Sequence, residues 1–292
     1  MSILRPRAAI IAALVALATL LGGCSALRLG YGQADVFAFR WLDGYADFDA
    51  VQARRVRQAL EAWFGWNRKT QLDDYARLLG RLEDAVLADT TPESVCGWWD
   101  EVRVRIDRGL EQALPAITEV AATLRPGQIE NVEQHYAKSN REFRDDFLQP
   151  DPARRLRDAA KRTIGRAEWL YGDLDRAQSD RVRASVARSP FDPVMAYDER
   201  LRRQQDSLQV LRRVAAGGLD AEAAQAEIRA FVRRAERSPR EPYRRYSERL
   251  VRDNCRLAAE IHNGTTTEQR KVAARRLRGW ADDLRALAAE AG

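Results

Sequence analysis

The stretch that decides the fold is residues 243–261, YRRYSERLVRDNCRLAAEI, in which apolar side chains recur every three or four residues. This spacing places side chains on one face of an α-helix, whereas a strand with one covered face alternates with a period of two. No segment of this chain alternates in that way over the length of a strand. The stretch therefore predicts an amphipathic helix whose apolar face must be covered by another helix.

The same spacing recurs along the chain after Gln33, near which we expect the first helix to begin. The other stripes are Leu72, Tyr75, Leu79, Leu82 and Val86; Val95, Trp98, Val102, Ile106 and Leu110; Ile129, Val132, Tyr136 and Phe143; Leu156, Thr163 and Leu170; Val194, Tyr197, Leu201, Leu208 and Leu211; and Leu277, Trp280, Leu284 and Leu287. We predict an all-α fold, an array or bundle of about ten amphipathic helices.

Prolines and glycines mark short loops between the stripes. Because proline lacks an N–H, we expect each of these prolines at a helix start or a connection. Three helix starts have the spacing of a capping box: Asp49 with Gln52, Asp175 with Gln178, and Thr265 with Glu268. We expect Gly264 to end the preceding helix in a left-handed conformation. The prolines between the stripes are Pro92, Pro115, Pro126, Pro150, Pro152, Pro190, Pro193, Pro239 and Pro242.

Besides Cys24, the chain has two cysteines, Cys96 and Cys255. In an oxidising compartment such a pair is most simply a disulfide, which here would tie the first half of the chain to its last helices. Spacing alone does not show that the two approach each other. Two buried free thiols are the alternative.

The charge pattern argues against a nucleic-acid partner. The chain has 49 basic and 43 acidic residues, and arginines alternate with acids instead of forming a basic stripe. Binding of phosphates along a duplex favours clustered charge of one sign. We interpret the pattern as solvated helix surfaces carrying ion pairs.

Residues that could perform chemistry are few. The two histidines, His135 and His262, have no partners at metal-ligand spacing, and no nucleophile elbow, phosphate loop or dinucleotide fingerprint occurs. We therefore expect a protein that is not an enzyme and has no metal. The densest polar cluster allows two interpretations, solvated or inter-helix polar pairs, or acids of a hydrolytic site. Its members are Asn140, Arg141, Glu142, Asp145 and Asp146.

The aromatic residues also leave two interpretations open. Trp63 and Trp66, with Trp98 and Trp99, form either an aromatic groove for a ligand or part of the core. The aromatic side chains of residues 36–45 either rest at a lipid interface or dock their helix onto the core.

The N-terminus has the pattern of an export signal. Arg5 and Arg7 precede an apolar run, Ala8–Leu21, which is short for a membrane span, and small residues lead to Cys24. The ending Leu21-Gly22-Gly23-Cys24 resembles the lipobox of bacterial lipoproteins.

The lipobox resemblance implies a location. Residues 1–23 would be a signal peptide removed on export, and Cys24 would carry diacylglycerol on its sulfur and an acyl chain on its new amino group. Membrane lipid would then hold residues 24–292 as a helical periplasmic domain, with a subdivision near residue 150 left open. Because Ser25 follows the cysteine, similarity to Gram-negative lipoproteins implies the periplasmic face of the outer membrane.

The chain also resembles a family of uncharacterised proteobacterial lipoproteins, a domain of unknown function. This resemblance implies an exported helical protein and supplies no activity. A weaker likeness, through Leu174–Gln178, is to periplasmic helical proteins of the Spy and CpxP type. The family's matching stretches are residues 28–33 (RLGYGQ), Trp41-Leu42-Asp43 with Tyr45, 96–100 (CGWWD), 140–146 (NREFRDD), Leu148-Gln149-Pro150, Leu170-Tyr171-Gly172 and His262-Asn263.

From these features we expect a non-enzymatic, lipid-anchored protein that binds a protein partner or unfolded chains in the cell envelope. Two alternatives remain at this point. One is an enzyme acting on peptidoglycan or lipopolysaccharide, and the other is a structural link between membrane and cell wall.

Overall fold

The computed structural model describes residues 26–290, and these form twelve α-helices and no strand. The predicted all-α fold is confirmed. The predicted signal peptide and Cys24 lie outside the described residues. The helices are α2 (Ala26–Gly32), α3 (Ala34–Ala46), α4 (Ala50–Thr70), α5 (Leu72–Ala85), α6 (Pro92–Ala121), α7 (Pro126–Phe147), α8 (Pro152–Tyr171), α9 (Arg176–Ala187), α10 (Pro193–Ala215), α11 (Ala221–Glu236), α12 (Glu241–Asn263) and α13 (Thr267–Ala289).

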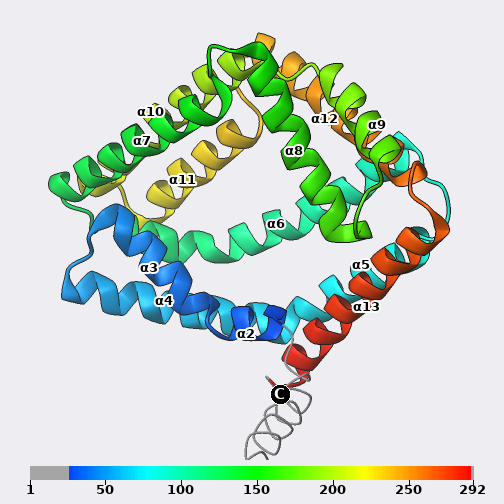
Figure 1. Ribbon diagram of the computed structural model, residues 1–292. Helices are drawn as coiled ribbons and strands as arrows, with labels where there is room; N and C mark the ends of the chain where they lie inside the picture. Colours follow the sequence, from blue (N-terminus) through cyan, green and yellow to red (C-terminus); the bar gives the residue numbers. More distant parts are fainter. Residues whose placement is uncertain (1–25, 291–292) are drawn as a thin grey trace, which may run out of the picture.

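The helices pack in pairs, and the pairs form the sides of an open frame (Figure 1). On one side α5 lies along α13, and on the opposite side α7 lies along α10. The long helix α6 crosses between these sides and packs against both α11 and α12. The subdivision left open near residue 150 falls between α7 and α8, and helices from the two halves of the chain pack against one another.

The apolar core is divided among several small clusters instead of one centre. The α5–α13 pair buries Leu72 and Ala76 against Ala281, Leu284 and Leu287. A second cluster joins α6 to α10 and α11, and a third joins α3 to α7 and α10. The clusters consist of residues between Leu27 and Ala288. The described helices supply the side chains of these clusters, and we expect residues 25–292 to fold as a unit.

Two of the three predicted capping boxes are confirmed. The Asp49 carboxylate accepts a hydrogen bond from the Gln52 N–H, and the Gln52 side chain accepts one from the Asp49 N–H. Asp175 and Gln178 form the same pair. In both boxes the glutamine is buried.

The third box is displaced by one residue, so the prediction of Thr265 with Glu268 is wrong. Thr266 caps α13 and pairs with Gln269. The reason is that the Thr265 hydroxyl donates to the His262 carbonyl at the end of α12, 2.6 Å away, and is already engaged.

The capping glutamines also hold helix starts together. The side-chain amides of Gln52 and Gln128 exchange hydrogen bonds at 2.7 and 3.1 Å, which joins the starts of α4 and α7. Gln178 and Gln269 do the same for α9 and α13, at 2.7 and 3.0 Å. Each of these four glutamines therefore serves a cap within its own helix and a contact between helices.

Three further expectations are corrected. Gly264 has a φ of −82°, so it is not in the left-handed conformation. The absence of a side chain instead allows it to lie close to the end of α12, because a Cβ at this position would be 3.2 Å from the Glu260 carbonyl oxygen. Pro115 lies inside α6, where the helix continues although one backbone hydrogen bond is lost. A helix, α2, precedes Gln33.

The predicted disulfide between Cys96 and Cys255 is present and joins α6 to α12, with Cα atoms 5.5 Å apart. Close by in the chain, His262 accepts a hydrogen bond on Nδ1 from the Tyr171 hydroxyl and donates from Nε2 to the Ala88 carbonyl. Burial lowers the pKa of His262 and raises the pKa of Tyr171 to about 12. Both groups therefore act as neutral links between α8, α12 and the loop after α5.

Within residues 26–290, the longest helices are too polar to cross a membrane.

Candidate functional site

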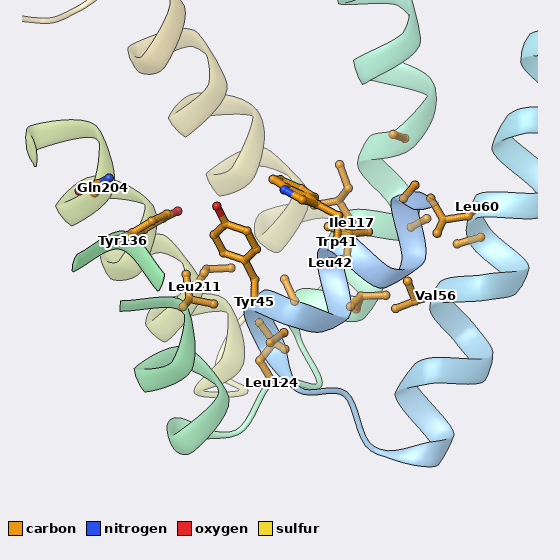
Figure 2. A pocket seen from close by; sticks show the side chains of 18 of the residues that line it. Trp41, Leu42, Tyr45, Val56, Leu60, Ile117, Leu124, Tyr136, Gln204 and Leu211 are labelled. Carbon is orange, nitrogen blue, oxygen red and sulfur yellow. The ribbon is translucent and has the colours of Figure 1, made fainter. Parts of the chain in front are cut away.

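An apolar groove of about 1200 Å³ lies between α3, α4, α6, α7 and α10. Figure 2 shows side chains from these helices pointing into it. Leu42 on α3 faces Val56 and Leu60 on α4, and Leu211 of α10 lies at the opposite wall. We refer to this hollow as the groove. A concave, mostly apolar surface with a few polar groups is typical of a ligand site.

Helix α3 carries the aromatic side chains of the groove. Its turn spacing places Trp41 and Tyr45 on one face, with ring centroids 4.9 Å apart, while Phe39 turns into the core. The Tyr45 ring lies near Tyr136 of α7, and Trp41 lines the groove together with Ile117 of α6 (Figure 2). Trp41 is 63% exposed although it lines the groove. An indole left in water in this way favours contact with a ligand.

Helices α4 and α6 form the floor, where small side chains leave room for a ligand. Ala59, Ala62, Ala113 and Ala116 line this part. The two helices are joined at Gly109, whose carbonyl accepts a hydrogen bond from the Trp63 indole at 2.8 Å. A Cβ on Gly109 would lie 3.3 Å from the Trp63 ring, so the glycine permits this close approach.

The α10 end of the groove is polar and carries arginine side chains. Glu199 is only 1% exposed and pairs with Arg202 at 2.8 Å and with Arg203 at 3.3 Å. Its other oxygen, Oε2, lies 3.8 Å from Arg240 of the α12 start and accepts no hydrogen bond among residues 26–290. Burying a carboxylate is unfavourable unless cations or hydrogen bonds compensate it, and here the arginines do so.

A second carboxylate belongs to the same charged set. Asp206 accepts two hydrogen bonds from Arg234, which hold the pKa of this carboxyl below its ordinary value. Arg202 contacts both Asp206 and Glu199. The set therefore has four arginines, numbers 202, 203, 234 and 240, and two carboxylates, which leaves an excess of positive charge beside the groove.

The polar cluster seen in the sequence is divided by the structure. Asn140 is buried between α7 and α10, where its amide exchanges hydrogen bonds with Gln204 and accepts one from Arg200 at 2.7 Å. The remaining members, Arg141, Glu142, Asp145 and Asp146, are exposed. The three carboxylates are exposed to solvent, so their burial gives no support to the hydrolytic interpretation of this cluster.

The tryptophans are also divided. Trp63 lines the groove, as the groove interpretation expects, whereas Trp99 is exposed and Trp98 lies under the Arg81 guanidinium. Trp66 contacts Trp63 with ring centroids 6.0 Å apart. Within the part of the chain that the structure describes, no three His, Cys, Asp or Glu side chains gather as they would around a metal ion.

Sequence reasoning missed Trp41 as a groove residue, and it missed Glu199 and Arg203. The sequence of α3 contained a hint, because Phe37 and Trp41 are four residues apart and so share one face of the helix. Both are exposed, whereas Phe39, on another face, is buried. For Glu199, no local signal distinguishes a buried acid from the exposed acids that surround it in sequence.

The comparisons with known proteins give one match. A sequence model described as "Family of unknown function (DUF6279)" matches residues 44–244, more than half of the 292-residue chain. The matched range contains the floor of the groove and its α10 end. No curated protein and no solved structure matches this chain.

Proposed function

The chain belongs to this family of unknown function, and we propose that it is a lipid-anchored, non-enzymatic binding protein of the cell envelope whose groove holds an apolar ligand. The observation that carries the proposal is the groove of about 1200 Å³, lined by apolar side chains of five helices and bordered by exposed Trp41. Burying such apolar surface against a ligand lowers the free energy of the complex. No covalent chemistry is required for this role.

The location is proposed from the sequence. Cys24 would carry diacylglycerol and an N-acyl chain, which would hold the protein on the periplasmic face of the outer membrane. Because several acyl chains anchor far more durably than one, the attachment would be permanent.

This anchor is tested by labelling cells with a radioactive or alkyne-tagged fatty acid. We expect label on the wild-type protein and none on Cys24→Ala, because the thiol and the new amino group that accept the acyl chains are lost with the cysteine. Equal labelling of the two proteins would contradict the anchor.

Binding in the groove is tested with residues 25–292 exported behind a cleavable signal, so that the disulfide forms. We expect saturable binding of a neutral apolar dye, N-phenylnaphthylamine, followed by its fluorescence. Ala116 lines the floor, so Ala116→Trp fills the groove and should weaken binding by at least about tenfold, through the loss of buried apolar contact.

The matched control is Ala153→Trp, which adds the same indole at an exposed position of α8 away from the groove. It should bind the dye as the wild type does. If Ala116→Trp and Ala153→Trp bind the dye equally well, the groove is not the binding site.

An unfolded protein chain is the second candidate ligand, and the exposure of Trp41 at the groove's edge favours it. A client chain could contact this indole without entering the groove completely. In this case residues 25–292 should suppress aggregation of a model client, and Ala116→Trp should suppress it less. No suppression at stoichiometric excess would remove this candidate.

A further inference from the structure

We infer that the ligand of the groove is an anionic lipid, with its acyl chain along the apolar walls and its head group at Arg203 on α10. The inference rests on the proposed function of the groove as a binding site, and it names the class of ligand. Three features of the described residues carry it: the state of Arg203, the charge balance around Glu199, and the composition of the walls.

At the edge of the groove, the guanidinium of Arg203 has N–H groups that donate to no other described residue. Its Nε donates to Glu199 at 3.3 Å, and its guanidinium carbon lies 5.6 Å from the centre of the Tyr243 ring. Its two Nη atoms donate no hydrogen bond within residues 26–290, although a guanidinium has five N–H donors. The two contacts hold the group in place, so that the remaining donors can bind a carboxylate or phosphate in the planar, bidentate manner typical of arginine.

The charge balance also favours an anion. Glu199 is buried among Arg202, Arg203 and Arg240, and the neighbouring Asp206 pairs with Arg202 and Arg234, so two carboxylates face four guanidinium groups. Arg200, which also lines the groove, binds Asn140 and Ser139, both neutral. An anionic head group at this end would neutralise the remaining positive charge of the arginines. A zwitterionic head group would interact less favourably with them, and a cationic one would be repelled.

The walls favour an acyl chain over a peptide. Every residue of a peptide brings an N–H and a C=O that need partners when buried. Leu60, Ile117 and Leu124 present apolar side chains to the groove, and all of its charged side chains, Glu199, Arg200 and Arg203, belong to α10. An acyl chain needs no partners along its length and one polar site at its head, which matches this distribution.

The experiment uses residues 25–292 and displacement of the neutral dye by two lysophospholipids with the same oleoyl chain, each below its micelle concentration. Lysophosphatidylglycerol is anionic and lysophosphatidylcholine is zwitterionic. We expect the wild type to bind lysophosphatidylglycerol about tenfold more tightly than lysophosphatidylcholine. This is the size of effect that one charge-assisted hydrogen bond gives. The salt concentration is kept constant, and in a second series it is raised, which should reduce this preference.

Three variants locate the head-group site. Arg203→Gln should bring the affinity ratio close to one by weakening only the anionic lipid. Glu199→Gln should raise the ratio, because it removes the negative charge that competes for Arg203. The control Arg213→Gln removes an arginine of the same helix that pairs with Glu227, outside the groove, and should leave the ratio unchanged. Thermal unfolding of each variant verifies that it is folded.

The outcomes separate this inference from the proposed function. Equal affinity for the two lipids, or a ratio that Arg203→Gln and Glu199→Gln do not change, overturns the inference while dye binding still supports a binding groove. Displacement of the dye by apolar peptides at lower concentration than by either lipid also overturns it. Absence of dye binding in the wild type refutes both proposals.

Discussion

Replacing both Cys96 and Cys255 by alanine is expected to lower the free energy of unfolding by about 5 kcal/mol, because the disulfide closes a very long loop. The two cysteines are 159 residues apart in sequence, and the chain entropy that a crosslink removes from the unfolded state grows with the logarithm of loop length. Wild-type protein in reductant should reach the same stability as the double variant. The measurement is urea unfolding with and without reductant, at constant pH.

The first half of α6 should respond most to this change. The buried residues of α6 are Gly109, Leu114, Thr118 and Ala121, all in its second half. The first half is held by the disulfide and by ion pairs such as Arg105 with Asp74. Hydrogen exchange in residues 92–108 should therefore accelerate more than in α13. A loss of stability below about 1 kcal/mol, the size of an ordinary surface change, would contradict this account of the disulfide.

Leu72→Ala is expected to cost about 3 to 4 kcal/mol of unfolding free energy, since it removes a buried side chain and leaves a cavity. Leu72 is 1% exposed and packs with Ala76, Ala281 and Leu284 between α5 and α13. These neighbours belong to two long helices that cannot close the cavity without moving as a whole. The change is measured by chemical denaturation and by the melting temperature.

The matched control for this prediction is Leu87→Ala, because Leu87 lies just after α5 and is 53% exposed. It should change stability by no more than about 0.5 kcal/mol, as surface substitutions usually do. A similar effect of both substitutions would show that the α5–α13 contact does not stabilise the protein as its burial indicates.

The helices themselves could be predicted from local sequence. The stripe over residues 243–261 lies within α12, which begins at Glu241 and ends at Asn263, and Pro242 stands in its first turn as expected. The N-caps Asp49 and Asp175 are local features too, because the groups that they satisfy lie within the next turn. Helix spacing and capping depend mainly on neighbours in sequence, so the pattern alone predicted the helices and two of the three capping boxes.

Other features depend on contacts between distant residues and could not be predicted. The position of Pro115 inside α6 depends on the surrounding helices, since a proline by itself suggests a helix boundary. The Val95–Leu110 stripe is not a buried core face, because Ile106 is 54% exposed. Asn140 was identified as a candidate, but only the structure shows it bound to Gln204 while Asp145 and Asp146 remain in solvent.

The groove escaped sequence reasoning for the same reason. Its lining comes from five helices between Ala38 and Leu211, together with Tyr243 of α12, and no local pattern links them. Helical spacing shows that Phe39 and Trp41 belong to different faces of α3. It does not show which face the other helices cover.

The central claim, that the groove holds an anionic lipid, is tested most directly by the lipids that the protein retains through purification. Residues 25–292 are exported, purified without detergent and extracted, and the lipids are identified by mass spectrometry. We predict a stoichiometric amount of anionic lipid in the wild type and in Ala153→Trp, and none above background in Ala116→Trp. The same lipid content in all three proteins, or none in the wild type, would contradict the claim.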